Sequence, residues 1–78
     1  MSVIVYSAVW CPWCQKTKEF LKEHNVEFEE RDIEKMDGAA DEVVKKSGQR
    51  GIPVIDVDGT IIVGYDKEAL KEALGIGD

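Results

Sequence analysis

The stretch that decides the fold is Trp10-Cys11-Pro12-Trp13-Cys14, which contains both cysteines of the 78-residue chain. It follows a short run of β-branched and aromatic residues at 2–7 and precedes a segment with helical spacing of apolar residues. Proline is favoured at the first position of a helix, where its missing N–H costs no hydrogen bond. The sequence therefore predicts a buried strand at 2–7, a turn at 8–10 and a helix that begins near Pro12.

The two cysteines are placed for reversible thiol chemistry. A helix that starts between Cys11 and Cys14 puts both sulfurs on one face, one turn apart. Unpaired N–H groups and the positive end of the helix dipole favour a thiolate at Cys11, and the thiolate is the nucleophile of disulfide exchange. A bridge between the two closes too short a loop to restrain the unfolded chain much. A purely structural pair is therefore the weaker interpretation.

A metal site is the main alternative interpretation of the cysteine pair. Zinc prefers four ligands, and the chain offers Cys11, Cys14 and one distant histidine, His24. A dimer would supply four thiolates to zinc or to an iron–sulfur cluster. The residues alone leave this alternative open beside redox exchange, which we favour; we predict no bound metal.

Length and charge limit the function classes. Seventy-eight residues form a single domain, 1–78, and a net charge of −6 at pH 7 argues against nucleic acid, which needs a basic face. The sequence shows no export signal and no stretch long enough for a membrane span. We therefore expect a cytoplasmic protein, a compartment where a close cysteine pair is more often catalytic or metal-binding than structural.

The spacing of apolar residues predicts the elements as far as residue 48. Apolar positions at Trp13, Thr17, Phe20 and Leu21 turn one face of the first helix inward, and this helix is expected to fray near residues 24–25. Charged residues interrupt the alternation at 26–33, which indicates a strand at a sheet edge. A second helix is predicted from near residue 37 to residue 48, and its apolar residues are Met36, Ala40, Val43 and Val44.

Turn and cap residues predict the elements after residue 52. Asp58-Gly59 joins strands at 53–57 and 60–63 as a two-residue hairpin. Asp66 then caps a last helix that ends at Gly75, with Tyr65 and Leu70 on either side of the cap as a hydrophobic staple. The predicted order is β-α-β-α-β-β-α, in which a parallel pair of strands is extended by an antiparallel hairpin.

This order, with Cys-x-x-Cys at the mouth of the first helix, resembles the thioredoxin fold, an α/β fold with a four-stranded mixed sheet flanked by three helices. Four segments are similar to the glutaredoxin branch of that superfamily, and the resemblance runs from about residue 3 to residue 74. These segments are Tyr6-Ser7, Cys11-Pro12-Trp13-Cys14, Gly51-Ile52-Pro53-Val54 and Val63-Gly64-Tyr65-Asp66.

The resemblance implies a dithiol oxidoreductase that reduces protein disulfides or glutathione mixed disulfides. Cys11 resembles the attacking cysteine and Cys14 the resolving one. Pro53 resembles the family's cis-proline, which sets the backbone of Ile52 opposite the active sulfur, where it pairs with a substrate chain as a strand would. Gly64, Tyr65 and Asp66 match the segment that holds the γ-glutamyl carboxylate of glutathione, in keeping with an anion site at a helix N-terminus.

Trp10, Pro12, Trp13 and Arg50 complete the predicted substrate site. At least one of the tryptophans is expected to lie exposed beside Cys11 as a contact surface, although apolar cover is the alternative role. Arg50 lies near the place where glutaredoxins recruit a glycyl carboxylate. Lys16 and Lys18, within two turns of Cys11, are candidates for favouring the thiolate, with ordinary solubility as the alternative.

The sequence leaves the reductant open. Many glutaredoxins carry a lysine three residues before the first cysteine, where this chain has Ala8, and Trp10 is more similar to thioredoxin. Glutathione and thioredoxin reductase are therefore both candidates. The expected partners are disulfide-containing proteins or glutathione adducts and one of these reductase systems, and we expect a monomer without a bound cofactor. A dimer that binds a metal or an iron–sulfur cluster through Cys11, in some glutaredoxins together with glutathione, is the alternative function.

Overall fold

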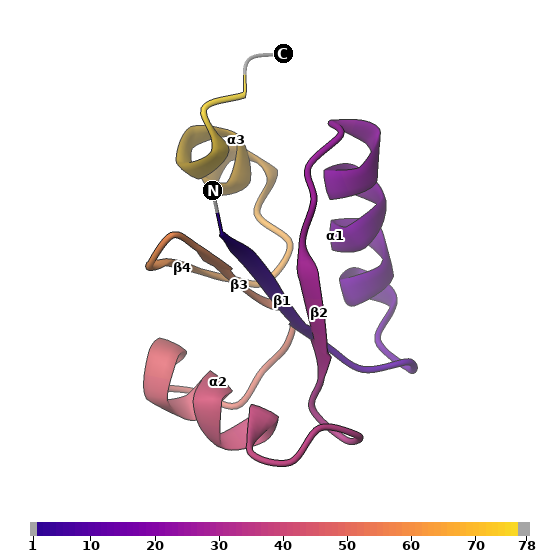
Figure 1. The fold of residues 1–78 in the computed structure, drawn as a ribbon, viewed down its shortest axis with the longest axis vertical. Coiled ribbons are helices and arrows are strands. Elements are labelled where there is room, and N and C mark those ends of the chain that lie inside the picture. The colour runs from indigo at the N-terminus through magenta and orange to yellow at the C-terminus, as the bar shows by residue number, and fades with distance from the viewer. Residues whose placement is uncertain (1, 77–78) are drawn as a thin grey trace.

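The computed structural model describes residues 2–76, and within them the elements follow the predicted order β-α-β-α-β-β-α (Figure 1). Their bounds are β1 Val3–Ser7, α1 Pro12–Glu23, β2 Glu29–Asp32, α2 Ala39–Ser47, β3 Val54–Val57, β4 Thr60–Val63 and α3 Lys67–Leu74.

The four strands form one mixed sheet in the order β2-β1-β3-β4. Strand β1 pairs in parallel with β2 and antiparallel with β3, and β3 pairs antiparallel with β4. The continuous apolar run of β1 is explained by its central place, because helices cover both faces there. The charged strand β2 lies at an edge, as predicted, where its side chains also discourage pairing with another chain.

The helices cover opposite faces of this sheet. Val3, Val5 and Ile55 face α1 and α3, whose Leu21 and Leu70 close the larger of two cores. The alternate residues Tyr6 and Val54 face α2 and pack on Val43. Figure 1 shows the sheet between α3 and α2. The alternation along β1 and β3 therefore assigns each side chain to one core.

The predicted turn and caps are confirmed. Asp58 and Gly59 both have positive φ, at 49° and 94°, which is the backbone that a two-residue hairpin requires. The side chain of Asp66 accepts a hydrogen bond from the N–H of Ala69 at 3.1 Å, and Gly75 ends α3 with a φ of 70°. Tyr65 packs beside the core that contains Leu70, as the staple predicts.

The structure differs from the predicted elements in four details. Strand β2 begins at Glu29 rather than 26, because Val26 and Phe28 pack against the core from the preceding loop. Helix α2 begins at Ala39, after a left-handed Gly38, and it buries Ala39 and Val43. The predicted apolar residues Met36, Ala40 and Val44 are exposed. In α1 the position next to Thr17 on the buried face is taken by Cys14, while Trp13 points to solvent.

A polar network fastens α2 to the sheet. The hydroxyl of Tyr6, on a side chain that is fully buried, donates to Glu42 at 2.6 Å and accepts from Lys46 at 2.8 Å. Lys46 also donates to Asp56 on β3 at 2.7 Å. Burial and the hydrogen bond to Glu42 raise the pKa of Tyr6. The hydrogen bond from Lys46 holds the pKa of Asp56 below its usual value, against the opposing effect of burial.

This network predicts an acid-sensitive contribution to stability. A carboxyl whose pKa is lowered by folding stabilises the protein above its unfolded pKa of about 4, and that contribution is lost as pH falls through the folded pKa. We expect Asp56→Asn to lower the free energy of unfolding by about 1 kcal/mol at pH 7 and by clearly less near pH 3. Urea unfolding at both pH values measures the difference.

The exposed variant Asp41→Asn is the control, because it makes the same change of net charge without touching the network. A stability difference between Asp56→Asn and the natural protein that is as large near pH 3 as at pH 7 would contradict the assignment.

Candidate active site

Cys11 is the residue that caps α1. Its sulfur accepts a hydrogen bond from the N–H of Cys14 at 3.2 Å, and its backbone is extended, as a capping residue requires. The structure contains the Cys11–Cys14 disulfide, with the two Cα atoms 5.2 Å apart. Pro12 occupies the first helical turn, so the position of the pair follows from the predicted start of the helix.

The two sulfurs differ in access. Cys14 is completely buried and Cys11 is 5% exposed. Both pack with Ala8, and Ile33 and Ile52 lie against this cluster. A reagent therefore reaches Cys11 more readily than Cys14, which is the arrangement expected of an attacking and a resolving cysteine.

The Ile52–Pro53 segment joins the cysteine pair to the start of α3. The peptide bond between these residues is cis, as the family resemblance implies. Ile52 packs against the cysteine cluster, while the carbonyl of Pro53 accepts a hydrogen bond from the N–H of Gly64 at 2.8 Å. Segments far apart in the sequence are thus held side by side at one end of the sheet.

The aromatic residues form an open surface beside Cys11. Trp10 and Trp13 are 60% and 57% exposed, so the prediction of at least one exposed tryptophan is confirmed for both. The ring of Trp13 stacks on that of Tyr65 at a centroid distance of 5.9 Å, and the Nζ of Lys16 lies 5.6 Å from the Trp13 ring. Trp13 therefore connects the cysteine pair to the predicted glutathione segment.

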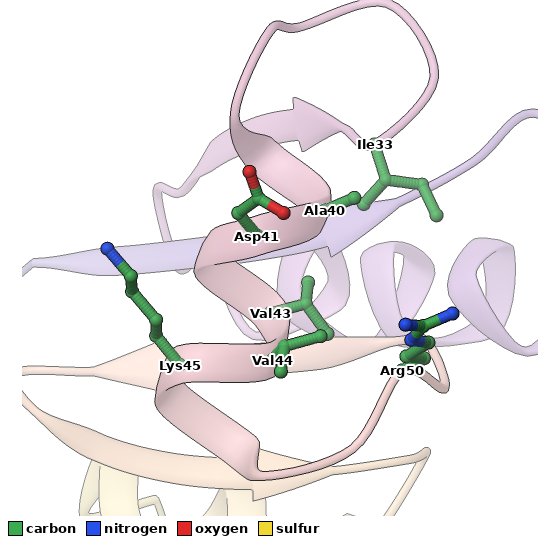
Figure 2. A pocket seen from close by; sticks show the side chains of 7 residues that line it. All are labelled: Ile33, Ala40, Asp41, Val43, Val44, Lys45 and Arg50. Carbon is green, nitrogen blue, oxygen red and sulfur yellow. The ribbon is translucent and has the colours of Figure 1, made fainter.

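The predicted carboxylate-binding residues lie on two sides of the site. Asp66 is occupied as a helix cap, and its own N–H donates to the carbonyl of Gly64 at 3.1 Å. Arg50 is exposed and lines a cavity of about 670 Å³ between α2 and the segment after β2. Figure 2 shows its guanidinium on the same side of this cavity as Ile33, which also contacts the cysteine cluster.

A polar contact beside the site was missed by the sequence analysis. Glu30 on β2 accepts hydrogen bonds from Lys18 at 2.7 Å and from the buried Ser7 at 2.8 Å. The bond from Lys18 and then the bond from Ser7 lower the pKa of Glu30. Lys18, a candidate for favouring the Cys11 thiolate, therefore forms an ion pair with Glu30 instead. This contact follows from the pairing of β1 with β2. Glu30 pairs with Val5, so its side chain lies on the face of the sheet that α1 covers, as do the side chains of Val5 and Ser7.

The described residues contain neither a cluster of metal ligands nor a helix able to span a membrane. Within residues 2–76, no three histidine, cysteine or carboxylate side chains gather where they could hold a metal ion. None of the helices in the same residues combines the length and apolar character needed to span a bilayer.

Comparison with known proteins identifies the family. The glutaredoxin family model matches residues 3–62. The chain belongs to the glutaredoxin family. It is 40% identical over 70 residues to an uncharacterised glutaredoxin-like 8.6 kDa protein encoded in the rubredoxin operon of Clostridium pasteurianum, covering 90% of this chain and 93% of that protein.

Two further glutaredoxins extend the comparison. Glutaredoxin 3 of Escherichia coli is 31% identical over 74 residues, covering 95% of this chain and 89% of the relative. A crystal structure of a glutaredoxin from Archaeoglobus fulgidus superposes with a TM-score of 0.86 at 35% identity, covering 94% of this chain and 85% of that one. The glutaredoxin fold and the redox-type cysteine pair support a thiol–disulfide oxidoreductase.

The unequal burial of the two sulfurs predicts selective alkylation. In the reduced protein we expect iodoacetamide to modify Cys11 at least about tenfold faster than Cys14, because the thiolate must be both formed and accessible. Both cysteines lie in the tryptic peptide of residues 1–16, so tandem mass spectrometry that locates the modified residue within this peptide over time measures the two rates. Equal modification of both cysteines in the folded protein would contradict the predicted roles.

Proposed function

We propose that this glutaredoxin is a dithiol–disulfide reductase in which Cys11 attacks and Cys14 resolves. The observation that carries the proposal is the place of Cys11 at the N-terminus of α1, where the Cys14 N–H donates to its sulfur. Such a donor and the positive end of the helix dipole stabilise a thiolate more than a thiol. The complete burial of Cys14 supports its role as the second sulfur to react.

The reaction proceeds in two exchange steps. The Cys11 thiolate attacks one sulfur of the substrate disulfide, so that a mixed disulfide forms and the other substrate sulfur leaves as a thiolate. Cys14 then loses its proton and attacks the sulfur of Cys11, which releases the second substrate thiolate and forms the Cys11–Cys14 disulfide. The substrate has gained two electrons from the pair, and the released thiolates take protons according to their pKa values.

The surface around Cys11 supports a protein chain as substrate. Trp10 and Trp13 offer apolar contact area, and the adjacent Val9 is 65% exposed. Ile52 packs against the cysteine cluster, and we propose that its main chain pairs with an extended substrate as a strand would. Aromatic side chains with little rotamer freedom suit such contacts. Protein disulfides are therefore the proposed substrates, with glutathione mixed disulfides as smaller members of the same class.

We propose two candidate reductants, each of which would use different residues of the site. Glutathione would use the start of α3 at Gly64–Asp66 for one carboxylate and Arg50 for the other. Thioredoxin reductase would dock on the exposed Trp10. Ala8, at the position where many glutaredoxins have lysine, is buried at 1% exposure and contributes no charge.

Reduction of the oxidised protein by each system assigns the reductant. One reaction contains glutathione, glutathione reductase and NADPH, and the other contains thioredoxin reductase and NADPH. The fluorescence of Trp10 and Trp13, which flank the disulfide, reports the reaction. Arg50→Ala is expected to slow the glutathione reaction if glutathione is the reductant. Failure of both systems under conditions where dithiothreitol reduces the protein would contradict both assignments.

The cysteine roles predict distinct mutant behaviour. Cys11→Ser is expected to lower the rate of disulfide reduction at least about 100-fold, because the nucleophile of the first step is lost. Cys14→Ser is expected to accumulate a mixed disulfide with the substrate, or to retain only activity that depends on glutathione. Insulin reduction and mass spectrometry under non-reducing conditions measure these outcomes. Full activity in a folded Cys11→Ser variant would overturn the proposal.

A further inference from the structure

We propose that Gln49 is a positioning residue for the exchange reaction. Its side-chain amide holds the turn that presents the Ile52 main chain to a substrate. This inference rests on the proposed function, and it concerns a residue whose hydrogen bonds within residues 2–76 are with Ser47 and Gly51 and not with either cysteine.

The side-chain amide of Gln49 makes hydrogen bonds to both backbone polar groups of Gly51. Its Oε1 accepts a hydrogen bond from the Gly51 N–H, and its Nε2 donates to the Gly51 carbonyl at 3.0 Å. Both polar groups of one residue are therefore satisfied by one side chain, in the manner of a short strand pairing. Within residues 2–76 no other hydrogen bond to the Gly51 N–H is found.

A second set of contacts anchors this side chain to α2. The Nε2 of Gln49 also donates to the hydroxyl of Ser47 at 3.1 Å. That hydroxyl lies 2.6 Å from the carbonyl oxygen of Val43, its acceptor in the helix, and Val43 is in the core beneath α2. The turn is thus connected through two side chains to a rigid element.

The glycine at position 51 independently supports this role. Its φ is not positive, so a turn does not require glycine there. A Cβ atom at this position would lie 2.6 Å from the Oε1 of Gln49, which is closer than real contacts allow. Gly51 is therefore the residue that permits the Gln49 amide to approach its backbone.

The location of the turn gives the contact a functional consequence. Ile52 follows Gly51 directly and packs against the cluster of Cys11 and Cys14. The turn itself is at the surface, since Arg50 and Gly51 are exposed, so the hydrogen bonds of Gln49 bury little apolar area. A polar contact at such a place contributes more to the direction of the Ile52 backbone than to global stability.

Gln49→Ala tests the proposal by separating substrate binding from chemistry. We expect KM for insulin reduction to rise about fivefold with kcat within about twofold of the natural value, because a backbone held less firmly binds an extended chain less well. The KM for bis(2-hydroxyethyl) disulfide, which has no peptide backbone to pair, is expected to rise less. The ratio of the two KM values is the quantity measured.

Amide hydrogen exchange gives a second readout that does not depend on turnover. The Gly51 N–H is expected to exchange at least about fivefold faster in Gln49→Ala, while the N–H of Ile55, in the middle of the sheet between β1 and β4, is unchanged. The isosteric Gln49→Glu keeps the acceptor but places a carboxylate oxygen against the Gly51 carbonyl, and we expect it also to raise KM for insulin.

Ile62→Val is the control for general destabilisation, since Ile62 lies in the core on the α3 side of the sheet. This variant is expected to lower the melting temperature without changing the ratio of KM values. An unchanged ratio in Gln49→Ala, with the natural protein active, would overturn the role of Gln49. Absence of insulin reduction by the natural protein would instead overturn the proposed function.

Discussion

The structure depends on the junction between the buried strand β1 and the N-terminus of α1. The strand is central and covered on both faces, so its end is fixed by packing on every side. The helix that follows begins at Pro12, and Cys11 is therefore held at the helix cap, where its sulfur accepts a hydrogen bond from the N–H of Cys14. Two apolar cores thus position one sulfur atom, and the chemistry proposed for this site uses that position.

The sequence predicted this junction because each of its signals is local. The β-branched run of β1, the proline of α1, the Asp58-Gly59 turn and the Asp66 cap each act within a few residues. Local signals predicted the element order and, with the family resemblance, the mixed sheet. Predictions that depended on helical spacing alone were weaker: the exposed Trp13 and Val44 occupy positions that periodicity assigns to a core. In α1 the buried place belongs to Cys14, whose small side chain carried little weight as an apolar residue.

Contacts between polar side chains from distant elements could not be predicted in this way. The bond of Glu30 to Ser7 depends on the parallel register of β2 on β1, and a shift of one residue would reverse the face on which Glu30 lies. The network of Tyr6, Glu42, Lys46 and Asp56 depends on where α2 crosses the sheet. Nothing in the sequence indicates that the amide of Gln49 folds back on Gly51.

The complete burial of Cys14 has a consequence for the kinetics of the proposed cycle. Only one sulfur of the disulfide, that of Cys11, is accessible. The reductant must therefore attack the oxidised protein at the same atom that attacked the substrate. Substrate and reductant then compete for one surface and cannot be bound productively together. The cycle is expected to alternate between them as a ping-pong exchange, in which a high concentration of either partner slows the half-reaction of the other.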